Sequence, residues 1–354
     1  MKILKKIFKK QQSLPVDEFF ENVLYDKNFG YYSKNNPFGK DGDFITAPSI
    51  SFLFSEMIAL WIVSYWESLN KPRIFNVVEL GPGDGKMCKT IMNTFKNFPE
   101  FYKSKKVFLY EKSEFLKKIQ KKNLRDYDVK WLSGIEPINQ GPVIFYGNEF
   151  FDAIPVKQYQ KKNKEMFERF VKIETNFQTK VFLKKISKKN DDEIRKFKVL
   201  KNNNFIEFPK LGFKELEKMI SKINKQNGGL LLIDYGYTKK INESTLQSIK
   251  LHKKSKLYKN IGNSDVTSLV NFNLLKEFFS KKKLYVNKVV SQSFFLKRMG
   301  ILQRAEIISK KMSFKDKSNL YFRLNRLLSA EHMGELFRVI FASKQKKVKN
   351  LGFF

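Results

Sequence analysis

The sequence predicts an α/β protein with a seven-stranded sheet, a helical N-terminal region and an inserted antiparallel subdomain. Three observations support this prediction. Short apolar runs alternate with helical patterns in the middle of the chain, a glycine-rich turn follows the first of these runs, and one later segment changes to alternating, strand-like stretches. Strands that alternate with helices imply βαβ units, which build a parallel sheet with right-handed connections.

Composition places the chain among globular proteins. Its 354 residues, 42% hydrophobic and 29% charged, can bury a large core. The single cysteine excludes a disulfide within the chain and favours a reducing compartment, and with only two histidines we predict no metal site. The basic start, MKILKKIFKKQQ, lacks the apolar stretch and cleavage site of a signal peptide. We therefore expect a cytoplasmic protein.

The formal net charge is +34, from 69 Lys and Arg against 35 Asp and Glu. Such an excess can attract RNA, DNA or an anionic membrane face. The lysines are spread along the whole chain with many Asn, Ile and Phe, as an AT-rich genome would produce. A diffuse lysine surface is more often solvated than bound, so a nucleic acid is disfavoured but stays open. The longest apolar stretch, residues 50–66, is interrupted by polar residues and predicts a buried helix, not a membrane span.

The elements can be assigned in order. Helical spacing predicts two helices within residues 15–69, separated by a long loop at residues 31–48. Strands are expected at residues 75–80, 107–110, 143–146 and 230–233, with helices after the first three, the last of them from Phe150 onward. Residues 284–296 and 336–342 are further strand-like runs. The predicted division is a helical region at 1–72, the first part of the core at 73–160, the insert at 161–227 and the rest of the core at 228–354.

The glycine-rich turn, Gly81-Pro82-Gly83-Asp84-Gly85, joins the strand at 75–80 to the next helix. Glycines let the backbone approach a ligand closely, and a helix start offers free N–H groups. The spacing excludes a P-loop and differs from the G-x-G-x-x-G of dinucleotide sites. Glu79, just before the turn, suits the sulfonium and ammonium of S-adenosyl-L-methionine better than a pyrophosphate. A tight connection without a ligand is the alternative for the turn taken alone.

Two further strand ends carry acidic residues. Glu111 follows the strand at 107–110, where a carboxylate can accept both ribose hydroxyls of a cofactor in a Rossmann-like site. Asn148, Glu149 and Asp152 follow the strand at 143–146 and should face the transferred methyl group, because ligands bind beyond the carboxyl ends of the strands. Two carboxylates there can hold a guanidinium and accept its proton. Helix capping by Asn148 or Asp152 is the alternative.

Other motifs extend the pattern over nearly the whole chain: Tyr31-Tyr32, Pro37-Phe38-Gly39, the GDFITAP of residues 42–48, Asp234-Tyr235-Gly236, Asp265-Val266-Thr267 and the MGELF of residues 333–337. Together with the glycine turn and residues 148–156, they resemble the MidA-like class I methyltransferases. Mitochondrial members of that family are complex I assembly factors that dimethylate an arginine symmetrically on a core subunit.

The resemblance implies a class I methyltransferase fold, S-adenosyl-L-methionine as cofactor and protein arginine as substrate. It implies cofactor contacts in the core and in a lid over the cofactor: Glu79, Gly81, Pro82, Gly83, Gly85, Glu111 and Asn148 in the core, and Gly42, Phe44, Thr46 and Pro48 in the lid. Asn148, Glu149 and Asp152 would form the catalytic, substrate side. The protein partner would be a subunit of respiratory NADH dehydrogenase, in the mitochondrial matrix for the eukaryotic relatives, and a homodimer stays open.

The chain departs from the family pattern at Ser49, at Ser55 and in residues 265–269, which lack the usual histidine. These departures bear on substrate identity and leave the glycine turn intact. Two other functions stay open. The Asn-Glu-Phe-Phe at 148–151 occupies the position of the Asn-Pro-Pro-Tyr of nucleic-acid amino-methyltransferases, although an acidic Glu149 is unfavourable beside phosphates. The other alternative is a non-catalytic assembly factor. We expect structural roles for Cys88, His252, His332 and Arg169.

Overall fold

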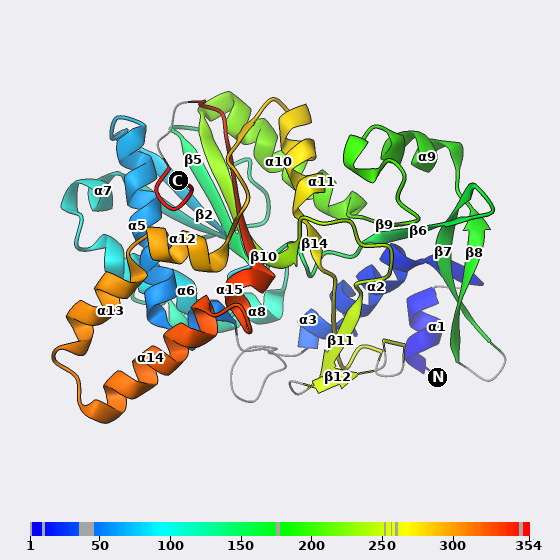
Figure 1. Ribbon diagram of the computed structural model, residues 1–354, viewed down its shortest axis with the longest axis horizontal. Coiled ribbons are helices and arrows are strands. Elements are labelled where there is room, and N and C mark those ends of the chain that lie inside the picture. The colour runs from blue at the N-terminus through cyan, green and yellow to red at the C-terminus, as the bar shows by residue number, and fades with distance from the viewer. Residues whose placement is uncertain are drawn as a thin grey trace. The chain divides into compact units, whose positions relative to one another are not determined.

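The computed structural model describes residues 2–8, 11–34, 46–174, 178–250, 253–255, 257–258, 261–346 and 350–354 (Figure 1). The chain divides into two units, each assembled from separate stretches. The first unit comprises Met1–Phe44, Phe151–Glu217 and Tyr237–Phe278, and the second comprises Ile45–Phe150, Lys218–Gly236 and Phe279–Phe354. No helix in the described ranges is long and apolar enough to cross a membrane.

A mainly parallel sheet forms the centre of the second unit. Its strands are β2 (Phe75–Leu80), β3 (Lys105–Tyr110), β4 (Lys130–Leu132), β5 (Val143–Asn148), β10 (Gly228–Tyr237), β15 (Tyr285–Val286) and β17 (Phe337–Ser343). They lie in the order β15–β17–β10–β5–β2–β3–β4. The neighbours from β10 to β4 are parallel, whereas β17 is antiparallel to β10. The predicted α/β class is confirmed, and the predicted seven strands correspond to this order, to which two short strands are added: β14 (Val270–Asn271) pairs with β10 and β16 (Val290–Ser291) pairs with β17.

The register of this sheet brings three strand ends together. Every residue of β2 is buried, and so are the first five residues of β5. Parallel strands covered on both faces have continuous apolar sequences, which is why these two runs could be recognised. Leu80 of β2 lies opposite Tyr110 of β3 and Gly147 of β5. The residues that follow these strands therefore share one edge of the sheet.

Helices of the second unit pack around this sheet (Figure 1). The long helix α5 (Phe52–Ser68) begins at Ser51, whose Oγ accepts a hydrogen bond from Leu53 N. Trp61 and Tyr65 of α5 meet Phe341 of β17 edge-on. The other helices are α4 (Ala47–Ile50), α6 (Lys86–Phe95), α7 (Pro99–Ser104), α8 (Glu114–Asn123), α12 (Gln292–Arg298), α13 (Ile301–Ser309), α14 (Phe314–Leu328) and α15 (Met333–Leu336), with α10 (Lys210–Gln226) running from the first unit into the second.

The first unit is built on an antiparallel sheet, which confirms the predicted antiparallel insert. Its order is β1–β7–β6–β9, with β8 also paired to β7. The strands are β1 (Ser13–Pro15), β6 (Lys157–Lys162), β7 (Glu165–Ile173), β8 (Thr179–Lys185) and β9 (Phe205–Phe208). A smaller sheet has the order β12–β11–β13, formed by β12 (Lys253–Ser255), β11 (Gln247–Lys250) and β13 (Asp265–Thr267).

The N-terminal stretch contributes to the core of the first unit. Buried residues of α1 (Lys2–Phe8), α2 (Val16–Tyr25) and α3 (Tyr31–Lys34) cluster with Val171 of β7 and Val266 of β13. The remaining elements are α9 (Lys188–Arg195), η1 (Lys198–Leu200), β14 (Val270–Asn271) and α11 (Phe272–Lys281), the last of which ends in the second unit. The two helices predicted within residues 15–69 are confirmed as α2 and α5.

Two local predictions were wrong. The helix expected from Phe150 onward is absent, because residues 151–154 form a turn and the next element is β6. The apolar run at residues 284–296 is not one strand: it contains β15, β16 (Val290–Ser291) and then α12. Ser291 ends the extended part, since its Oγ accepts a hydrogen bond from Phe294 N and caps the helix.

Candidate functional site

The glycine turn of the second unit has the backbone geometry that a close ligand contact requires. Gly81, Gly83 and Gly85 have φ values of +61°, +56° and +84°, a region in which side chains other than glycine are strained. A Cβ at Gly81 would lie 3.1 Å from the ring of Phe150. Gly85 also caps α6, so the first N–H groups of that helix follow the turn directly.

Glu79 lies on β2 just before this turn and is only 3% exposed. Tyr146 of β5 donates a hydrogen bond from Oη to Glu79 Oε2 at 2.9 Å. Burial raises the pKa of Glu79 to about 8, although the hydrogen bond from Tyr146 acts in the opposite direction. A carboxyl group held in this way is suited to a cation, because a neighbouring positive charge would stabilise its ionised form.

Glu111, after β3, is linked to the glycine turn by a residue that sequence reasoning missed. Glu111 accepts hydrogen bonds from Ser113 N at 2.8 Å and from Gln120 Nε2 at 3.1 Å. The same Gln120 Nε2 donates to Gly83 O at 2.8 Å, and Gln120 Oε1 accepts from Trp131 Nε1 at 2.9 Å. Burial raises the pKa of Glu111, while these hydrogen bonds lower it.

Gln120 is completely buried on α8. Its amide joins the glycine turn, Glu111 and β4, so one side chain positions two of the predicted cofactor contacts. Three residues further along α8, Asn123 Nδ2 donates to Asp84 O at 2.8 Å and fixes the turn a second time. A signal for Gln120 exists in the sequence, since it is an uncharged residue four positions after Leu116, on the apolar side of a lysine-rich helix.

Asn148 and Glu149 lie at the end of β5, also in the second unit. Glu149 has a φ of +52°, a left-handed conformation that costs about 1–2 kcal/mol for a residue with a side chain. Its N–H donates to Ile233 O at 2.9 Å. Its Oε1 accepts from Asn148 Nδ2 at 3.1 Å and from Ala47 N at 3.4 Å.

These contacts connect the predicted substrate side with the predicted lid. Ala47 lies between Thr46 and Pro48, two of the predicted lid contacts, whereas Gly42 and Phe44 lie outside the described residues. The Oδ1 atom of Asn148 is buried and has no hydrogen-bond partner within the described part of the chain. A buried acceptor of this kind favours a ligand that carries N–H donors.

Asp152 lies three residues after Glu149 and belongs to the first unit. It is 4% exposed and lies in the turn at residues 151–154, where its carbonyl oxygen accepts from Ser268 N at 3.1 Å. No helix starts at this turn, so helix capping by Asn148 or Asp152 is excluded. In the next peptide, Ala153 O accepts a hydrogen bond from Tyr25 Oη at 2.9 Å.

Two of the motifs that carry the family resemblance, Tyr31-Tyr32 and Asp265-Val266-Thr267, contact each other near Asp152. Tyr32 Oη donates to Asp265 Oδ2 at 2.7 Å, and the rings of Tyr25 and Tyr32 stack at 5.3 Å. Burial raises the pKa of Tyr32 well above its usual value, and the negative charges of Asp265 and Asp152 add to this effect. Tyr25, Tyr32 and Asp265 thus lie around the turn that contains Asp152.

Three of the four residues with expected structural roles lie in the described part of the chain, and of these Cys88 is close enough to Glu79 to feel its charge. Cys88 is buried, and burial raises the pKa of its thiol. His332 precedes α15 at its N-cap position, and Arg169 of β7 lies over the Phe205 ring. His252 is not among the described residues. Within the described ranges, no group of three His, Cys, Asp or Glu side chains could hold a metal ion.

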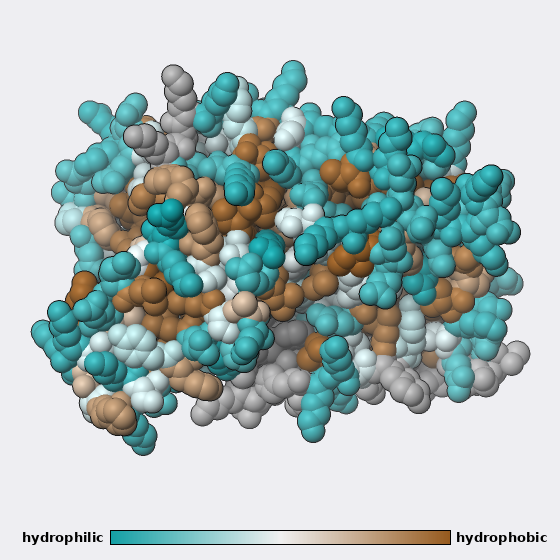
Figure 2. Space-filling model, viewed as in Figure 1, coloured by the Kyte–Doolittle hydropathy of each residue, from teal (hydrophilic) through white to brown (hydrophobic). Residues whose placement is uncertain are grey.

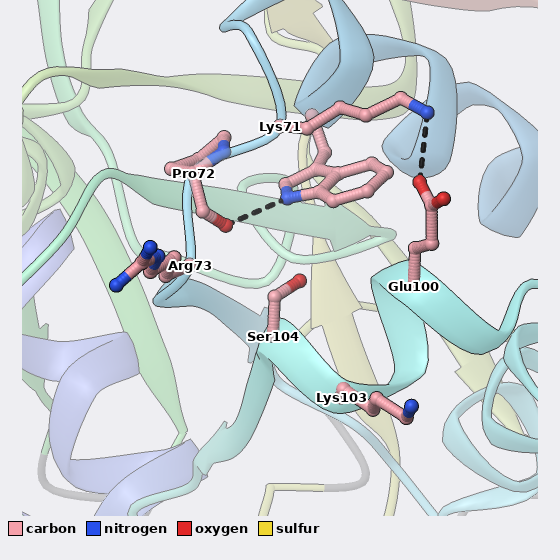
Figure 3. Close-up of a pocket in the computed structure, with 7 residues that line it drawn as sticks. Lys71, Pro72, Arg73, Glu100, Lys103 and Ser104 are labelled. Atoms are coloured by element: carbon pink, nitrogen blue, oxygen red, sulfur yellow. Dashed lines mark hydrogen bonds and ion pairs between the residues drawn. The ribbon is translucent and has the colours of Figure 1, made fainter.

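A pocket of about 240 Å³ lies at the opposite end of the sheet (Figure 3). It is lined by Trp66, Lys71, Pro72, Arg73, Glu100, Lys103 and Ser104. Trp66 Nε1 donates to the Pro72 carbonyl oxygen at 3.0 Å. Figure 3 shows Lys71 paired with Glu100, with 2.8 Å between Lys71 Nζ and Glu100 Oε2. Because these residues precede β2 and β3, the pocket is at the amino ends of the strands, where open α/β sheets do not bind their ligands.

Comparison with known proteins agrees with this geometry. The model of a family described as S-adenosyl-L-methionine-dependent methyltransferase matches residues 57–290. Protein arginine methyltransferase NDUFAF7, mitochondrial, of Xenopus tropicalis is 28% identical over 97% of this chain and 86% of its own length. The human protein of that name is 27% identical over 92% and 78%. The crystal structure of a Burkholderia thailandensis protein bound to S-adenosyl-homocysteine has the same fold, with a TM-score of 0.83, 21% identity and coverage of 99% and 92%.

Proposed function

This chain belongs to the family of S-adenosyl-L-methionine-dependent methyltransferases, and we propose that it methylates an arginine side chain of a protein. The observation that carries the proposal is the placement of Glu149 at the end of β5, beside Asn148 and Ala47, in a conformation that costs free energy. Strain of this kind persists where the surrounding structure holds a residue for its function. The names of the relatives, protein arginine methyltransferases, support the same substrate class.

The cofactor side of the proposal rests on the second unit. S-adenosyl-L-methionine supplies a methyl group on a positively charged sulfur. We assign its ammonium to Glu79, its ribose hydroxyls to Glu111 and the close backbone approach to Gly81, Gly83 and Gly85. The buried carboxyl of Glu79 and the glycine φ values fit these tasks. Pro82, Thr46 and Pro48 complete the contacts that we propose among the described residues, and Gly42 and Phe44 remain in the proposed lid.

The substrate side needs a group that binds a guanidinium and accepts a proton. Glu149 can orient the planar guanidinium by charge-assisted hydrogen bonds, and Asn148 Oδ1 can accept another N–H. For Asp152, which belongs to the first unit, a contact with the substrate is a separate proposal. One nitrogen gains the methyl group as the sulfur–carbon bond breaks, and that nitrogen then loses a proton. A carboxylate beside it provides the acceptor, and alignment and short approach provide most of the acceleration.

The finer assignment rests on the family resemblance alone. It comprises symmetric dimethylation, an arginine on a subunit of respiratory NADH dehydrogenase as target, and a role in complex I assembly. A homodimer is compatible with it. The single cysteine supports a reducing, cytoplasmic location, whereas the relatives named above are mitochondrial.

The test is a pair of substitutions at Glu149. Glu149→Gln removes the negative charge, and Glu149→Gly removes the carboxylate while favouring the left-handed backbone, so at least one variant should fold. We expect methyl transfer to an arginine-containing protein substrate to fall at least about 100-fold in both. S-adenosyl-homocysteine affinity, measured by calorimetry, should change by less than about threefold, because Glu149 is assigned to the substrate side.

The control is Glu100→Gln, which removes an exposed carboxylate at the opposite end of the sheet. Its activity should equal that of the unchanged protein. Full activity of both Glu149 variants would refute the assignment of Glu149. Methylation of RNA and not of protein would favour the nucleic-acid alternative. A folded protein that binds no cofactor would favour the non-catalytic assembly factor.

A further inference from the structure

Helices α13 and α14 form a hairpin on the second unit, at the lower left of Figure 1. Its inner side is anchored by buried residues, which are Ile301 and Ala305 of α13 and Leu320, Leu324 and Leu327 of α14. Arg304 of α13 also forms a bidentate ion pair with Glu56 of α5: Nε donates to Oε2 at 2.9 Å, and Nη2 donates to Oε1 at 3.2 Å. These contacts attach the hairpin to α5, and the opposite side of the hairpin faces solvent.

The outer side of this hairpin exposes large apolar side chains. Phe314 is 90% exposed, Phe322 67% and Ile307 60%, and Leu302 and Tyr321 are exposed as well. Phe314 opens α14 directly after the connection between the two helices. Figure 2 shows brown and tan side chains interspersed with teal ones over this region. Five large apolar side chains exposed on one helical hairpin favour a surface that contacts a partner.

Cations surround these apolar residues. Residues 310–323 carry five exposed cations, Lys310, Lys311, Lys315, Lys317 and Arg323, against one acid, Asp316. Asp316 is engaged in the cap of α14, where Ser313 Oγ donates to its carboxylate at 2.6 Å and accepts from its N–H at 3.1 Å. Within the described part of the chain, no carboxylate forms an ion pair with any of the five cations. The excess of positive charge therefore faces solvent.

We propose that this hairpin binds the surface of an anionic lipid membrane. Exposed apolar side chains can enter the boundary between headgroups and acyl chains, while neighbouring lysines bind anionic headgroups. A second copy of this chain is disfavoured, because the two surfaces would bring like charges together. Single-stranded nucleic acid could stack on Phe314, Tyr321 and Phe322 but would leave Leu302 and Ile307 in water, whereas a membrane surface would bury both kinds of side chain. The inference is independent of the methyl transfer.

The test uses sedimentation of the whole chain with vesicles of phosphatidylglycerol and phosphatidylcholine in equal parts, compared with phosphatidylcholine alone. We expect binding to the anionic vesicles only. The double variant Phe314→Ser, Phe322→Ser should weaken binding at least about tenfold, since it removes two large apolar groups. The quadruple variant with Lys310, Lys311, Lys315 and Lys317 each changed to Gln should also weaken it at least about tenfold.

Matched controls separate this hairpin from the general charge of the chain. A second quadruple variant changes four exposed lysines near α9 to Gln, namely Lys188, Lys189, Lys196 and Lys198. Tyr285→Ser removes an apolar side chain of β15 that is 48% exposed. Both should bind almost as the unchanged protein does. If the α9 variant lost as much vesicle binding as the hairpin variant, the proposal would be overturned, because binding would then depend on the total charge of the chain.

A fluorescence measurement tests insertion directly. In Phe314→Trp, the emission of the new indole should shift to shorter wavelength when anionic vesicles are added, because the ring leaves water. An unshifted emission, or no sedimentation of the unchanged protein, would overturn the proposal and leave an acidic protein surface as the better candidate for this hairpin.

Discussion

Glu79 is a carboxyl group held out of water on β2, and its protonation should govern cofactor binding. Burial raises its pKa to about 8, so much of the cofactor-free protein carries a proton there at neutral pH. A bound ammonium favours the carboxylate, and the proton must then leave. In the cofactor-free protein the folded state holds this proton more tightly than the unfolded chain. The stability contribution is therefore complete below about pH 4.5 and is lost as the pH rises through about 8.

We expect cofactor affinity to rise with pH below about 8, by up to about tenfold per pH unit, because binding releases the Glu79 proton. Above about 8 the affinity should fall again as the α-amino group of the cofactor loses its charge. Calorimetry in buffers of different ionisation enthalpy counts the released protons. In Glu79→Gln, the cofactor affinity should no longer rise with pH below about 8. If that rise persists in the variant, another group supplies the proton.

Gln120 is the second residue whose effect can be isolated. Gln120→Leu leaves Gly83 O, Glu111 Oε2 and Trp131 Nε1 without their present partner. Each loss costs about 1–3 kcal/mol if the group stays buried, so the glycine turn and Glu111 should shift. We expect the KM for S-adenosyl-L-methionine to rise at least about tenfold, with a much smaller change in kcat.

A matched control for Gln120 exists in the same unit. Gln292 is also completely buried and donates from Nε2 to a backbone oxygen, Leu327 O, at 3.0 Å. Gln292→Leu should lower stability by about 1–3 kcal/mol, because one buried group loses its partner, and should leave the cofactor KM unchanged. Equal effects of both substitutions on KM would mean that Gln120 acts only through global stability.

At the scale of elements, a buried charge cluster joins α2, β6 and β7 of the first unit. Lys157 of β6 pairs with Asp17 of α2 at 3.0 Å and with Glu168 of β7 at 2.7 Å. Burial by itself would lower the pKa of Lys157, but the two carboxylates raise it overall, whereas burial raises the pKa of Asp17. Helix α2 is thus attached to β6 and β7 by a paired cation.

Lys157→Met should destabilise the first unit by about 3–5 kcal/mol, because it leaves two buried carboxylates without their cation. Urea unfolding followed by circular dichroism measures the loss. Adding Asp17→Asn and Glu168→Gln to Lys157→Met should recover part of the stability, since the uncompensated charges are then gone. A triple variant less stable than Lys157→Met would contradict this account.

At the scale of the whole molecule, the second unit contains most of the residues assigned to the reaction. All described cofactor-side residues, and Asn148 and Glu149 of the substrate side, belong to it. The first unit contains Asp152 and the hydrogen bond between Tyr32 and Asp265, which are 233 residues apart. It is assembled from three stretches of chain. The predicted four-segment division of the chain stays a prediction, and so do the roles of the site residues.

Local patterns were sufficient to predict much of the architecture. The strands β2 and β5 are continuous apolar runs, and the three glycines of the turn lie within five residues, so each could be recognised from a short stretch of sequence. Prediction failed where a short apolar segment could adopt several conformations. Residues 292–296 are helical because Ser291 caps them, and residues 151–154 turn directly into an antiparallel strand. Gln120 could not be assigned a role, because its three partners come from separate parts of the chain.

The sequence by itself determined the α/β class, the glycine turn with its acids at Glu79 and Glu111, and the Asn148–Glu149 strand end. These features depend on apolar periodicity and on glycine, whose conformational freedom is a property of the residue. Only the tertiary structure decided the strained φ of Glu149, the three-way hydrogen bonding of Gln120, the meeting of Tyr32 with Asp265 and the exposed face of α13 and α14. Each of these depends on which distant segments pack together, and local sequence preferences do not specify that packing.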